Sequence, residues 1–415
     1  MSKDTHKITI IGVTEAGCMA LAPDARALIK AAEFIFASKR FHGTIETDGI
    51  IESWPSPFSD LTARLESIDG NIIVLATGDP LWFGVGASLI AYFGHDQCQI
   101  IPAVSGFQMA ASRMGWSLAD CETLSVHGRP VTRIIPYLYP RARLLVLTAN
   151  AQSANDIAAC LVDCGYGSAH LTALGDIGSD HEARHEGIAD SWAHENISDF
   201  HIMAITLPED VGAAGMALPD SLFETDGKMT KRDLRASALA KLAPFPGAVL
   251  WDVGAGSGAV SIDFLRHAPR GKAYAIDRDD TQIKRAVNNA TRLGVGIMND
   301  SPDASGLHAV HASLPEGLAD LPPADAIFIG GGLSPEVISL CQKYLRLGGV
   351  LVAHAVTLES ETILLSSWQA TKGDLTRIAV NHADPVGGYH GWRAQMPVTQ
   401  WVWHKDTETS GYIHE

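Results

Sequence analysis

The sequence lacks long apolar runs. No uninterrupted stretch reaches the ~18 residues that a membrane-spanning helix needs, so we expect no such helix. The first residues, Met1 to Lys7, are polar and lack the apolar segment of a signal peptide. Cysteine is scarce, and none of the six cysteines forms a C-x-x-C pair, which is typical of a reducing compartment. These absences predict a soluble, cytoplasmic protein.

Basic residues are fewer than acidic residues. Lys and Arg number 31 against 47 Asp and Glu, which gives a formal net charge of −16. A general nucleic-acid-binding protein needs a basic stripe that neutralises phosphates, and adhesion to an anionic membrane needs the same sign of charge. The acidic balance therefore argues against nucleic acid and against membrane as partners.

The rest of the composition is that of a globular protein. Hydrophobic residues make up 46% of the 415 residues and charged residues 19%, so the chain has enough apolar material for buried cores and is not a disordered chain. At ~150 residues per domain, this length predicts two or three domains.

Short apolar runs alternate with helical patterns along the chain, which predicts an α/β fold. In the first half we expect strands at Lys7–Gly12, Glu33–Ala37, Asn71–Ala76, Cys98–Pro102, Arg143–Thr148, Ala169–Ala173 and Phe200–Thr206. In the second half we expect strands at Ala248–Val253, Lys272–Ile276, Ala324–Ile329, Gly349–Val356, Leu375–Asn381 and Pro397–His404. Between the two series, the stretch 208–227 contains prolines and glycines and has no sustained period, so we interpret it as a linker.

A helix is expected soon after this linker. Thr230-Lys231-Arg232-Asp233 fits a capping box, in which the Thr230 hydroxyl would cap the first helical turn. Leu234, Ala238 and Leu242 follow at intervals of four residues, which predicts one apolar helix face.

The sharpest local motif is the loop Asp252-Val253-Gly254-Ala255-Gly256-Ser257-Gly258, which follows a predicted strand and opens a predicted helix at Ala259–His267. Glycines allow a tight backbone turn, and a ligand can lie against a backbone that carries no Cβ. The next predicted strand runs up to Asp277, whose carboxylate can accept hydrogen bonds from both ribose hydroxyls of a nucleoside cofactor.

Two cofactors fit this motif. Gly254-x-Gly256-x-x-Ala259 satisfies the dinucleotide fingerprint, and Asp277 also suits the ribose of NAD. The pattern D-x-G-x-G-x-G instead resembles the first motif of class I methyltransferases that use S-adenosylmethionine (SAM), in which the acidic residue orients the loop near the methionine moiety. We favour SAM, and an NAD-dependent oxidoreductase is the alternative.

Three pieces of the first half carry a second set of motifs. Gly78-Asp79-Pro80 follows an apolar strand and forces a turn at its carboxyl end, where ligands of α/β proteins usually bind. The other two pieces are Pro102–Gln108 and Ser125–Arg129. Together they resemble the tetrapyrrole methylases, the class III SAM-dependent methyltransferases of corrin and sirohaem biosynthesis.

The second half resembles the decarboxylating precorrin methyltransferases. The stretches that carry this resemblance are Asp226–Arg232, the glycine loop, Leu314–Glu316, Phe328–Gly332 and Gly391–Arg393. Both halves in this order resemble the fused precorrin-6B (precorrin-6Y) C-5,15-methyltransferases (decarboxylating) of aerobic cobalamin biosynthesis, and the resemblance covers residues 8–405.

The resemblance implies an N-terminal bilobal class III tetrapyrrole methylase fold at 1–207, with lobes at about 1–104 and 105–207. It implies a C-terminal Rossmann-like class I SAM methyltransferase fold at 228–415. The implied reactions on precorrin-6B are methylation at C-5 by the first domain and at C-15 by the second, with decarboxylation of the C-12 acetate to give precorrin-8. One SAM per domain and a homo-oligomer are also implied. A non-catalytic tetrapyrrole-binding protein is a further alternative, against which the intact glycine loop argues.

The resemblance also implies the cofactor contacts. They are Gly78, Asp79, Pro80, Ser105 and Gly106 in the first domain, and Thr230, Gly254, Ala255, Gly256, Ser257, Gly258, Asp277, Ser313 and Leu314 in the second. Because the implied substrate is a polycarboxylate, we expect local cations, and arginine binds carboxylates through a bidentate fork. The candidate substrate contacts are His127, Arg129, Arg232, Arg235 and Arg393. No residue is assigned to decarboxylation.

Three positions in two stretches depart from the family pattern, and one further motif has to be weighed. Thr14 and Glu15 stand where the first loop of the family usually has Gly and Pro, and Ser313 stands where an acidic residue is common. The stretch 181–185 matches the H-E-x-x-H signature of zinc proteases. Its polar flanks and bracketing glycines favour a solvated loop or a strand edge, so we expect no metal.

Overall fold

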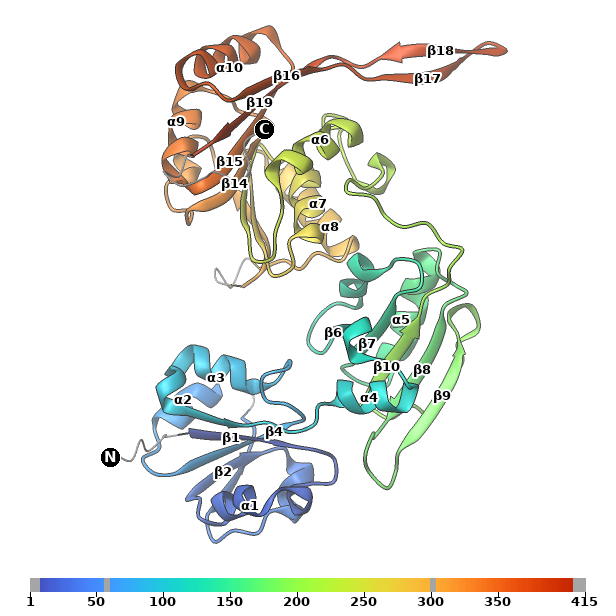
Figure 1. Cartoon of the computed structure of the whole chain (residues 1–415), viewed down its shortest axis with the longest axis vertical. Coiled ribbons are helices and arrows are strands. Elements are labelled where there is room, and N and C mark those ends of the chain that lie inside the picture. Colours follow the sequence, from blue (N-terminus) through green and yellow to red (C-terminus); the bar gives the residue numbers. More distant parts are fainter. Residues whose placement is uncertain (1–7, 56–59, 299–303, 406–415) are drawn as a thin grey trace. The chain divides into compact units, whose positions relative to one another are not determined.

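The structure is a computed structural model that describes residues 8–55, 60–298 and 304–405. The chain divides into two compact units, each of which is visible in Figure 1. Unit 1 holds the residues up to Val131 and from Tyr137 to Val211, and unit 2 holds Thr132–Pro136 and the chain from Gly212 onward. Both units consist of sheets flanked by helices, which confirms the predicted α/β class.

The first lobe of unit 1 is a five-stranded parallel sheet in the order β3-β2-β4-β1-β5. Its strands are β1 (Ile8–Val13), β2 (Phe34–Ala37), β3 (Ile50–Ser53), β4 (Ile72–Thr77) and β5 (Cys98–Ile101). The helices of this lobe are α1 (Pro23–Lys30), α2 (Asp60–Glu66) and α3 (Val85–Phe93). Parallel neighbours need such crossover connections, and the carboxyl ends of all five strands meet at one edge.

Helices cover both faces of this sheet. Leu61 of α2 and Leu89 of α3 pack with Val74 of β4 in one core. Ile29 of α1 packs with Leu75, the next residue of the same strand, in the other core. Because successive side chains of a strand point to opposite faces, one apolar strand serves both layers.

The second lobe of unit 1 is a mixed sheet in the order β6-β7-β10-β8-β9. Its elements are α4 (Gly106–Met114), β6 (Glu122–Ser125), β7 (Arg143–Leu147), α5 (Gln152–Asp163), β8 (His170–Gly175), β9 (Ala183–Ile188) and β10 (His201–Thr206). β6 and β7 are parallel, and the other pairings are antiparallel. Phe107 of α4 packs against Leu145 and Leu174 of the sheet.

Unit 2 is built on a seven-stranded sheet in the order β13-β12-β11-β14-β15-β19-β16. Its strands are β11 (Val249–Val253), β12 (Lys272–Asp277), β13 (Gly306–His311), β14 (Ala324–Ile329), β15 (Leu345–Ala355), β16 (Asp374–Ile378) and β19 (Val398–His404). The first five strands in this order are parallel, and β19 is antiparallel to both of its neighbours. This confirms the predicted Rossmann-like fold.

Helices again cover both faces of the sheet (Figure 1). They are α6 (Arg232–Leu242), α7 (Ala259–His267), α8 (Asp280–Arg292), α9 (Pro335–Tyr344) and α10 (Leu358–Thr371). Phe264 of α7 packs with Leu250 of β11 on one face, and Ile338 of α9 packs with Trp251, the next residue of β11, on the other. The alternation along β11 therefore holds the three layers together.

A two-stranded hairpin, β17 (Asn381–Val386) and β18 (Tyr389–Ala394), extends away from the rest of unit 2 (Figure 1). The single predicted strand 375–381 is wrong at its end, because β16 stops at Ile378 and Asn381 already begins β17. The hairpin has two solvated faces, with Tyr389 and Trp392 about four-fifths exposed, so it leaves no clear alternation in the sequence.

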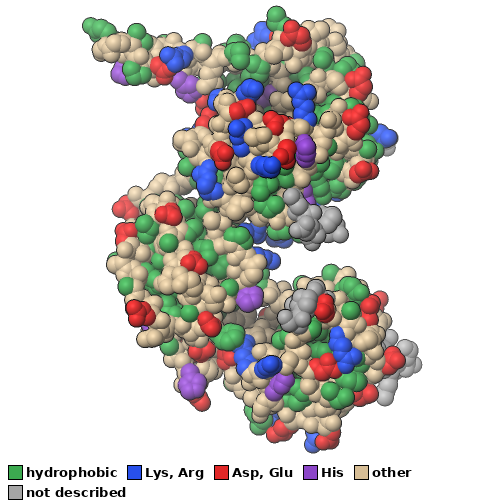
Figure 2. All heavy atoms as spheres, turned by 180° about the vertical axis from the view of Figure 1, so that it is seen from behind, with side chains coloured by type: hydrophobic (Ala, Val, Ile, Leu, Met, Phe, Trp, Pro, Cys, Tyr) green, Lys and Arg blue, Asp and Glu red, His purple; other side chains and the backbone are tan. Residues whose placement is uncertain are grey.

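Short 3₁₀ turns connect these elements. They are η1 (Cys18–Ala20), η2 (Lys39–Thr44), η3 (His95–Gln97), η4 (Leu118–Asp120), η5 (Val131–Tyr137), η6 (Ala189–Ser191), η7 (Asp220–Leu222) and η8 (Glu316–Leu318). Among the residues described, no helix combines the length and the apolar character needed to cross a bilayer. The face shown in Figure 2 carries acidic and basic side chains interspersed.

Phe264 provides a test of the core of unit 2. This side chain is fully buried, so Phe264→Ala should lower the free energy of unfolding by about 3–5 kcal/mol through lost burial and the cavity left behind. Leu358, which is 78% exposed, is the matched control, and Leu358→Ala should change stability by less than about 0.5 kcal/mol. Urea denaturation, with the transitions of the two units fitted separately, measures both. Equal effects of the two substitutions would contradict the described packing.

Candidate functional site

Unit 2 contains a cavity of about 710 Å³ at the carboxyl ends of its central parallel strands. This volume lies within the ~300–1,000 Å³ typical of small-molecule sites. The predicted cofactor contacts that line it are Thr230, Gly254, Ala255, Gly256, Ser257, Asp277, Ser313 and Leu314. Gly258 lies outside the lining and is the N-cap of α7. The structure therefore brings eight of the nine predicted positions of this domain together.

The glycine loop follows β11 and passes close to a second glycine loop, 330–332, which follows β14. A Cβ on Gly254 would lie 2.7 Å from the Cα of Gly331, and Gly254 has a φ of 71°. A side chain there would push the two loops apart. Gly256 differs, because no described residue other than its two chain neighbours has an atom within 4 Å of where its Cβ would be. The backbone at Gly256 is thus open to a ligand.

Asp277 closes the loop from the neighbouring strand. Its Oδ2 accepts a hydrogen bond from the Gly256 N–H at 2.9 Å, and its Oδ1 accepts one from the Asp279 N–H at 3.0 Å. A carboxylate has about four lone-pair positions, so both oxygens can accept further hydrogen bonds from ligand hydroxyls. The geometry suits the predicted ribose contact.

Two polar atoms in the lining have no partner in the described part of the chain: Ser257 Oγ and Gln282 Oε1. Gln282 lies on α8, and its Nε2 donates to Asp226 Oδ2 at 2.9 Å. An unpaired buried polar atom costs ~1–3 kcal/mol, and a polar ligand in the cavity would offset this cost. The donor and acceptor set fits a nucleoside cofactor. Gln282 was missed from the sequence, where its position is one polar residue of an amphipathic helix.

Asp252, the acidic residue before the glycines, lines the cavity but is almost fully buried. Its Oδ2 accepts hydrogen bonds from the Ser261 N–H at 3.0 Å and from the Ser261 Oγ at 2.7 Å. Burial raises the pKa of Asp252 to about 6, while the Ser261 bonds lower it and the nearby Asp277 raises it further. Asp252 therefore ties the end of β11 to α7 and holds the glycine loop between them.

Thr230 lines the cavity, but the predicted capping box is wrong. The helix begins at Arg232 with Lys231 as N-cap, and no side chain caps it. The Thr230 carbonyl instead accepts a hydrogen bond from Arg235 Nη1 at 2.7 Å. An arginine one turn into the helix thus satisfies the backbone that precedes it, and the sequence pattern could not distinguish the two arrangements.

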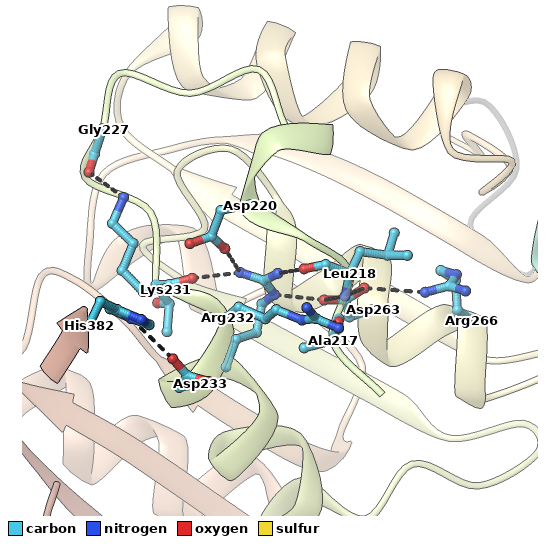
Figure 3. A network of polar contacts seen from close by, with 12 residues as sticks. Ala217, Leu218, Asp220, Gly227, Lys231, Arg232, Asp233, Asp263, Arg266 and His382 are labelled. Carbon is cyan, nitrogen blue, oxygen red and sulfur yellow. Dashed lines mark hydrogen bonds and ion pairs between the residues drawn. The ribbon is translucent and has the colours of Figure 1, made fainter. Parts of the chain in front are cut away.

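Arg235 was predicted to bind substrate, and the structure contradicts this. Its side chain is fully buried, with Nε donating to Asp263 Oδ2 at 2.6 Å and Nη1 to Asp220 Oδ1 at 3.0 Å. Nη2 donates to the Leu218 carbonyl. Figure 3 shows this network between helix α7 and the segment that precedes α6. Arg235 is a structural cation that binds this segment, which was predicted to be a linker, onto unit 2.

The other two predicted cations of this half lie outside the cavity lining. Arg232 donates from Nε to the Ala217 carbonyl at 3.0 Å (Figure 3). Arg393 lies on β18, is 79% exposed at its side chain and pairs with Asp384 at 3.0 Å. The lining includes two cations that were not predicted as substrate contacts, Lys228 and Arg278.

Unit 1 has a smaller cavity, of about 170 Å³, at the carboxyl edge of its first sheet. Of the predicted cofactor contacts, Gly78, Asp79, Ser105 and Gly106 line it and Pro80 does not. Gly78 has a φ of 67°, and Asp79 Oδ1 accepts a hydrogen bond from the Leu81 N–H at 2.7 Å. Ser105 caps α4 in a reciprocal capping box with Gln108. These contacts shape the turns that border the cavity.

His127 lines the same cavity, with its Nδ1 3.3 Å from the Thr148 carbonyl, whereas Arg129 is exposed and does not line it. Thr14 and Glu15, the departures from the family loop, also line the cavity. Glu15 pairs with Arg40 at 3.0 Å. Arg40 was missed from the sequence, because a single arginine after a strand carries no motif.

The H-E-x-x-H stretch, residues 181–185, runs from a turn into an edge strand. Ala183 begins β9, and residues along this strand alternate between half-buried and exposed, which confirms the predicted strand edge. Glu182 pairs with Arg113 at 2.6 Å. Within the described ranges, no cluster of His, Cys, Asp and Glu side chains has the arrangement of a metal site.

Comparisons with known proteins follow the same division of the chain. A family model described as Tetrapyrrole (Corrin/Porphyrin) Methylases matches residues 7–187, and one described as Precorrin methyltransferase domain matches 221–405. A precorrin-6Y C(5,15)-methyltransferase (decarboxylating) from Sinorhizobium sp. is 38% identical over 96% of this chain and 96% of its own.

Two further similarities are of the same kind. The protein of the same name from Mycobacterium tuberculosis (strain CDC 1551 / Oshkosh) is 33% identical over 95% of this chain and 98% of its own. The crystal structure of the C-terminal domain of a precorrin-6Y C5,15-methyltransferase from Rhodobacter capsulatus is 38% identical. It covers 45% of this chain and 98% of that chain, with a TM-score of 0.41.

The Arg235 network makes a prediction about stability. Arg235→Ala leaves Asp263 buried without its main counter-charge and should lower the free energy of unfolding of unit 2 by about 3–5 kcal/mol. The double substitution Arg235→Met with Asp263→Leu removes both charges and should recover most of this loss. Arg232→Ala, the control, should change little. Urea denaturation measures the free energy of unfolding of all three variants. An Arg235→Ala variant as stable as wild type would contradict the structural role of Arg235.

The buried Asp252 makes a prediction about pH. Its native pKa of about 6 lies above the ~3.9 of an unfolded Asp, so the native state binds the proton more strongly. Stability from this group is therefore present at low pH and is lost as pH rises from about 4 to 6, by about 2–3 kcal/mol. Asp252→Asn should remove this dependence.

The measurement is the free energy of unfolding of unit 2 at a series of pH values from 4 to 8. The curve of the Asp252→Asn variant should rise relative to wild type across that window, whereas the exposed control Asp280→Asn should not show this rise. Parallel curves for wild type and Asp252→Asn would contradict the burial of a charged carboxylate.

Proposed function

Because the chain belongs to the family of precorrin-6Y C(5,15)-methyltransferases (decarboxylating), we propose that it methylates precorrin-6B at C-5 and C-15 and decarboxylates the C-12 acetate, giving precorrin-8. The observation that supports this most is the similarity to fused relatives over nearly the whole of both chains. It agrees with the predicted SAM-dependent methyltransferase and not with the NAD-dependent alternative.

The division of labour belongs to the proposal. Residues 1–207 would carry C-5 methylation and residues 228–415 would carry C-15 methylation with decarboxylation, joined by 208–227. The methyltransferase family implies SAM as the methyl donor, and we propose one SAM in each domain. A cavity at the carboxyl edge of a parallel sheet in each unit supports two sites.

In the second domain, several residues of the cavity would contact SAM. Asp277 would accept hydrogen bonds from the ribose hydroxyls, and the open backbone at Gly256 would lie against the cofactor. Ser257 Oγ and Gln282 Oε1 would gain the partners that they lack. When bound, SAM supplies a methyl group that is already activated for transfer.

The protein's contribution to the chemistry is orientation. A reduced tetrapyrrole supplies a nucleophilic carbon, so no covalent protein nucleophile is required, and correct alignment of the reactants can lower the barrier by ~7–11 kcal/mol. The glycine loop is held for this task by Asp252, which binds Ser261 of α7. The cavity wall at Thr230 is held by Arg235.

The polycarboxylate substrate needs cations at the mouths of the sites. Lys228 and Arg278 line the cavity of unit 2 and would meet its carboxylates. His127 lines the cavity of unit 1 and would contact a substrate carboxylate there. Arg129, Arg232 and Arg393 lie outside the linings and would contact only parts of the substrate that extend beyond the cavities.

The cellular setting is a further part of the proposal. We propose that the enzyme acts in the cytoplasm as a homo-oligomer. All six cysteines are unbridged, which is consistent with a reducing compartment. Light scattering coupled to size-exclusion chromatography tests the oligomer directly, and a mass of 44.2 kDa at micromolar concentration would contradict it.

Separate sites predict separable activities. Asp277→Ala removes the ribose acceptor of the second domain and should reduce C-15 methylation at least 10- to 100-fold, while C-5 methylation persists. The assay incubates the full chain with precorrin-6B and methyl-labelled SAM and locates the label in the product. Asp280→Ala, an exposed neighbour, is the control. Loss of both transfers would contradict independent sites, and unchanged C-15 transfer would contradict the role of Asp277.

A further inference from the structure

Two buried polar groups in the cavity of unit 1 lack partners. Arg40 Nε and Nη1 and His201 Nε2 have no hydrogen-bond partner in the parts of the chain that the structure describes, and both residues line the cavity. Leaving such groups unpaired is unfavourable, and more so for a charged group. The cavity therefore contains unused donors and an unused ring nitrogen.

The guanidinium of Arg40 is fixed in place. Its Nη2 donates to Thr77 Oγ1 at 2.6 Å and pairs with Glu15 at 3.0 Å. Its central carbon lies 4.2 Å from the ring centroid of Phe200 and 4.7 Å from that of Phe41. Only 23% of the side chain is exposed. Arg40 is thus a preorganised cation whose Nε and Nη1 donors are unpaired among the described residues.

The ring of His201 is oriented as an acceptor. Its Nδ1 lies 2.8 Å from the Ser198 carbonyl, and a carbonyl can only accept, so Nδ1 carries the proton. Nε2 of the neutral ring is then an acceptor. His201 is 5% exposed, and burial lowers its pKa, which favours this neutral form.

The charges of the lining select a kind of ligand. The carboxylates are Glu15, Asp79, Asp176 and Asp199, against the single guanidinium of Arg40. A purely anionic ligand would be repelled by this acidic surplus, whereas a purely cationic ligand would leave the Arg40 N–H groups unpaired. A zwitterion satisfies both. The volume of about 170 Å³ is below that of a whole small-molecule site and suits one end of a ligand.

We propose that the cavity of unit 1 binds the α-amino-acid end of the methyl donor, with Arg40 donating to its carboxylate. Glu15, Asp176 and His201 Nε2 accept from its ammonium group. This inference rests on the proposed function, which places a SAM in the first domain. It assigns roles to Glu15, a departure from the usual family loop, and to Arg40, which belongs to no motif.

The test compares two ligands that differ only in this end. S-adenosylhomocysteine (SAH) carries the amino-acid group, and 5′-deoxy-5′-methylthioadenosine keeps the nucleoside and the sulfur without it. Calorimetry is carried out on the full chain with Asp277→Ala in every variant, so that the first-domain site is observed. In this background Arg40→Gln should weaken SAH binding about 10- to 100-fold and leave methylthioadenosine binding unchanged. Arg40→Lys should restore part of the loss.

The control is Arg64→Gln, which breaks another Arg–Glu pair of the same lobe, to Glu52, away from the cavity. Arg64→Gln should change the affinity for neither SAH nor methylthioadenosine. Unchanged SAH binding in Arg40→Gln would overturn the inference, and a raised KM for the tetrapyrrole alone would assign Arg40 to a substrate carboxylate instead. Equal weakening of both ligands would reduce Arg40 to a structural role. If the Asp277→Ala chain binds no SAH at all, the proposed SAM site of the first domain fails, and the inference fails with it.

Discussion

The candidate cofactor site of unit 2 depends on the close approach of two backbone loops. Gly254 and Gly331 follow the adjacent parallel strands β11 and β14. Their backbones lie so close together that a side chain at Gly254 would collide with Gly331. This contact places the first loop at the edge of the cavity and leaves Gly256 open beside Asp277. The packing of the two loops therefore requires a glycine at position 254 even without a ligand.

Two buried ionisable side chains, Asp252 and Arg235, hold the loops around this cavity in place. Asp252 connects the loop to α7, and Arg235 connects α7 to the segment that carries Thr230. Each of these charges has a desolvation cost, and hydrogen bonds to fixed partners offset it. The glycine loop and the segment with Thr230 are distant in the sequence, but both are held through hydrogen bonds to α7. The cavity of unit 1 also has lining residues with polar atoms that lack a partner in the described part of the chain, and there they include N–H groups of a cation, Arg40.

Much of this could be predicted from the sequence, and the reasons are physical. Strands buried on both faces read as apolar runs: β4 is apolar from Ile72 to Ala76, and β11 is interrupted only by Asp252. The glycine loop and Asp277 have the spacing of a nucleoside-cofactor site. The hairpin of β17 and β18 has no buried face and left no such pattern. Arg235 was misassigned because sequence does not reveal burial, and Arg40 and Gln282 acquire meaning only when the fold brings them to a cavity.

The central claim is that one chain carries two methylation sites and one decarboxylation. The most direct measurement is product stoichiometry, with precorrin-6B, methyl-labelled SAM and the purified full chain. The account predicts two labelled methyl groups and one carbon dioxide per precorrin-6B consumed. One methyl group per substrate would mean that one domain is idle, and the absence of methyl transfer together with tight binding of NAD would contradict the account as a whole.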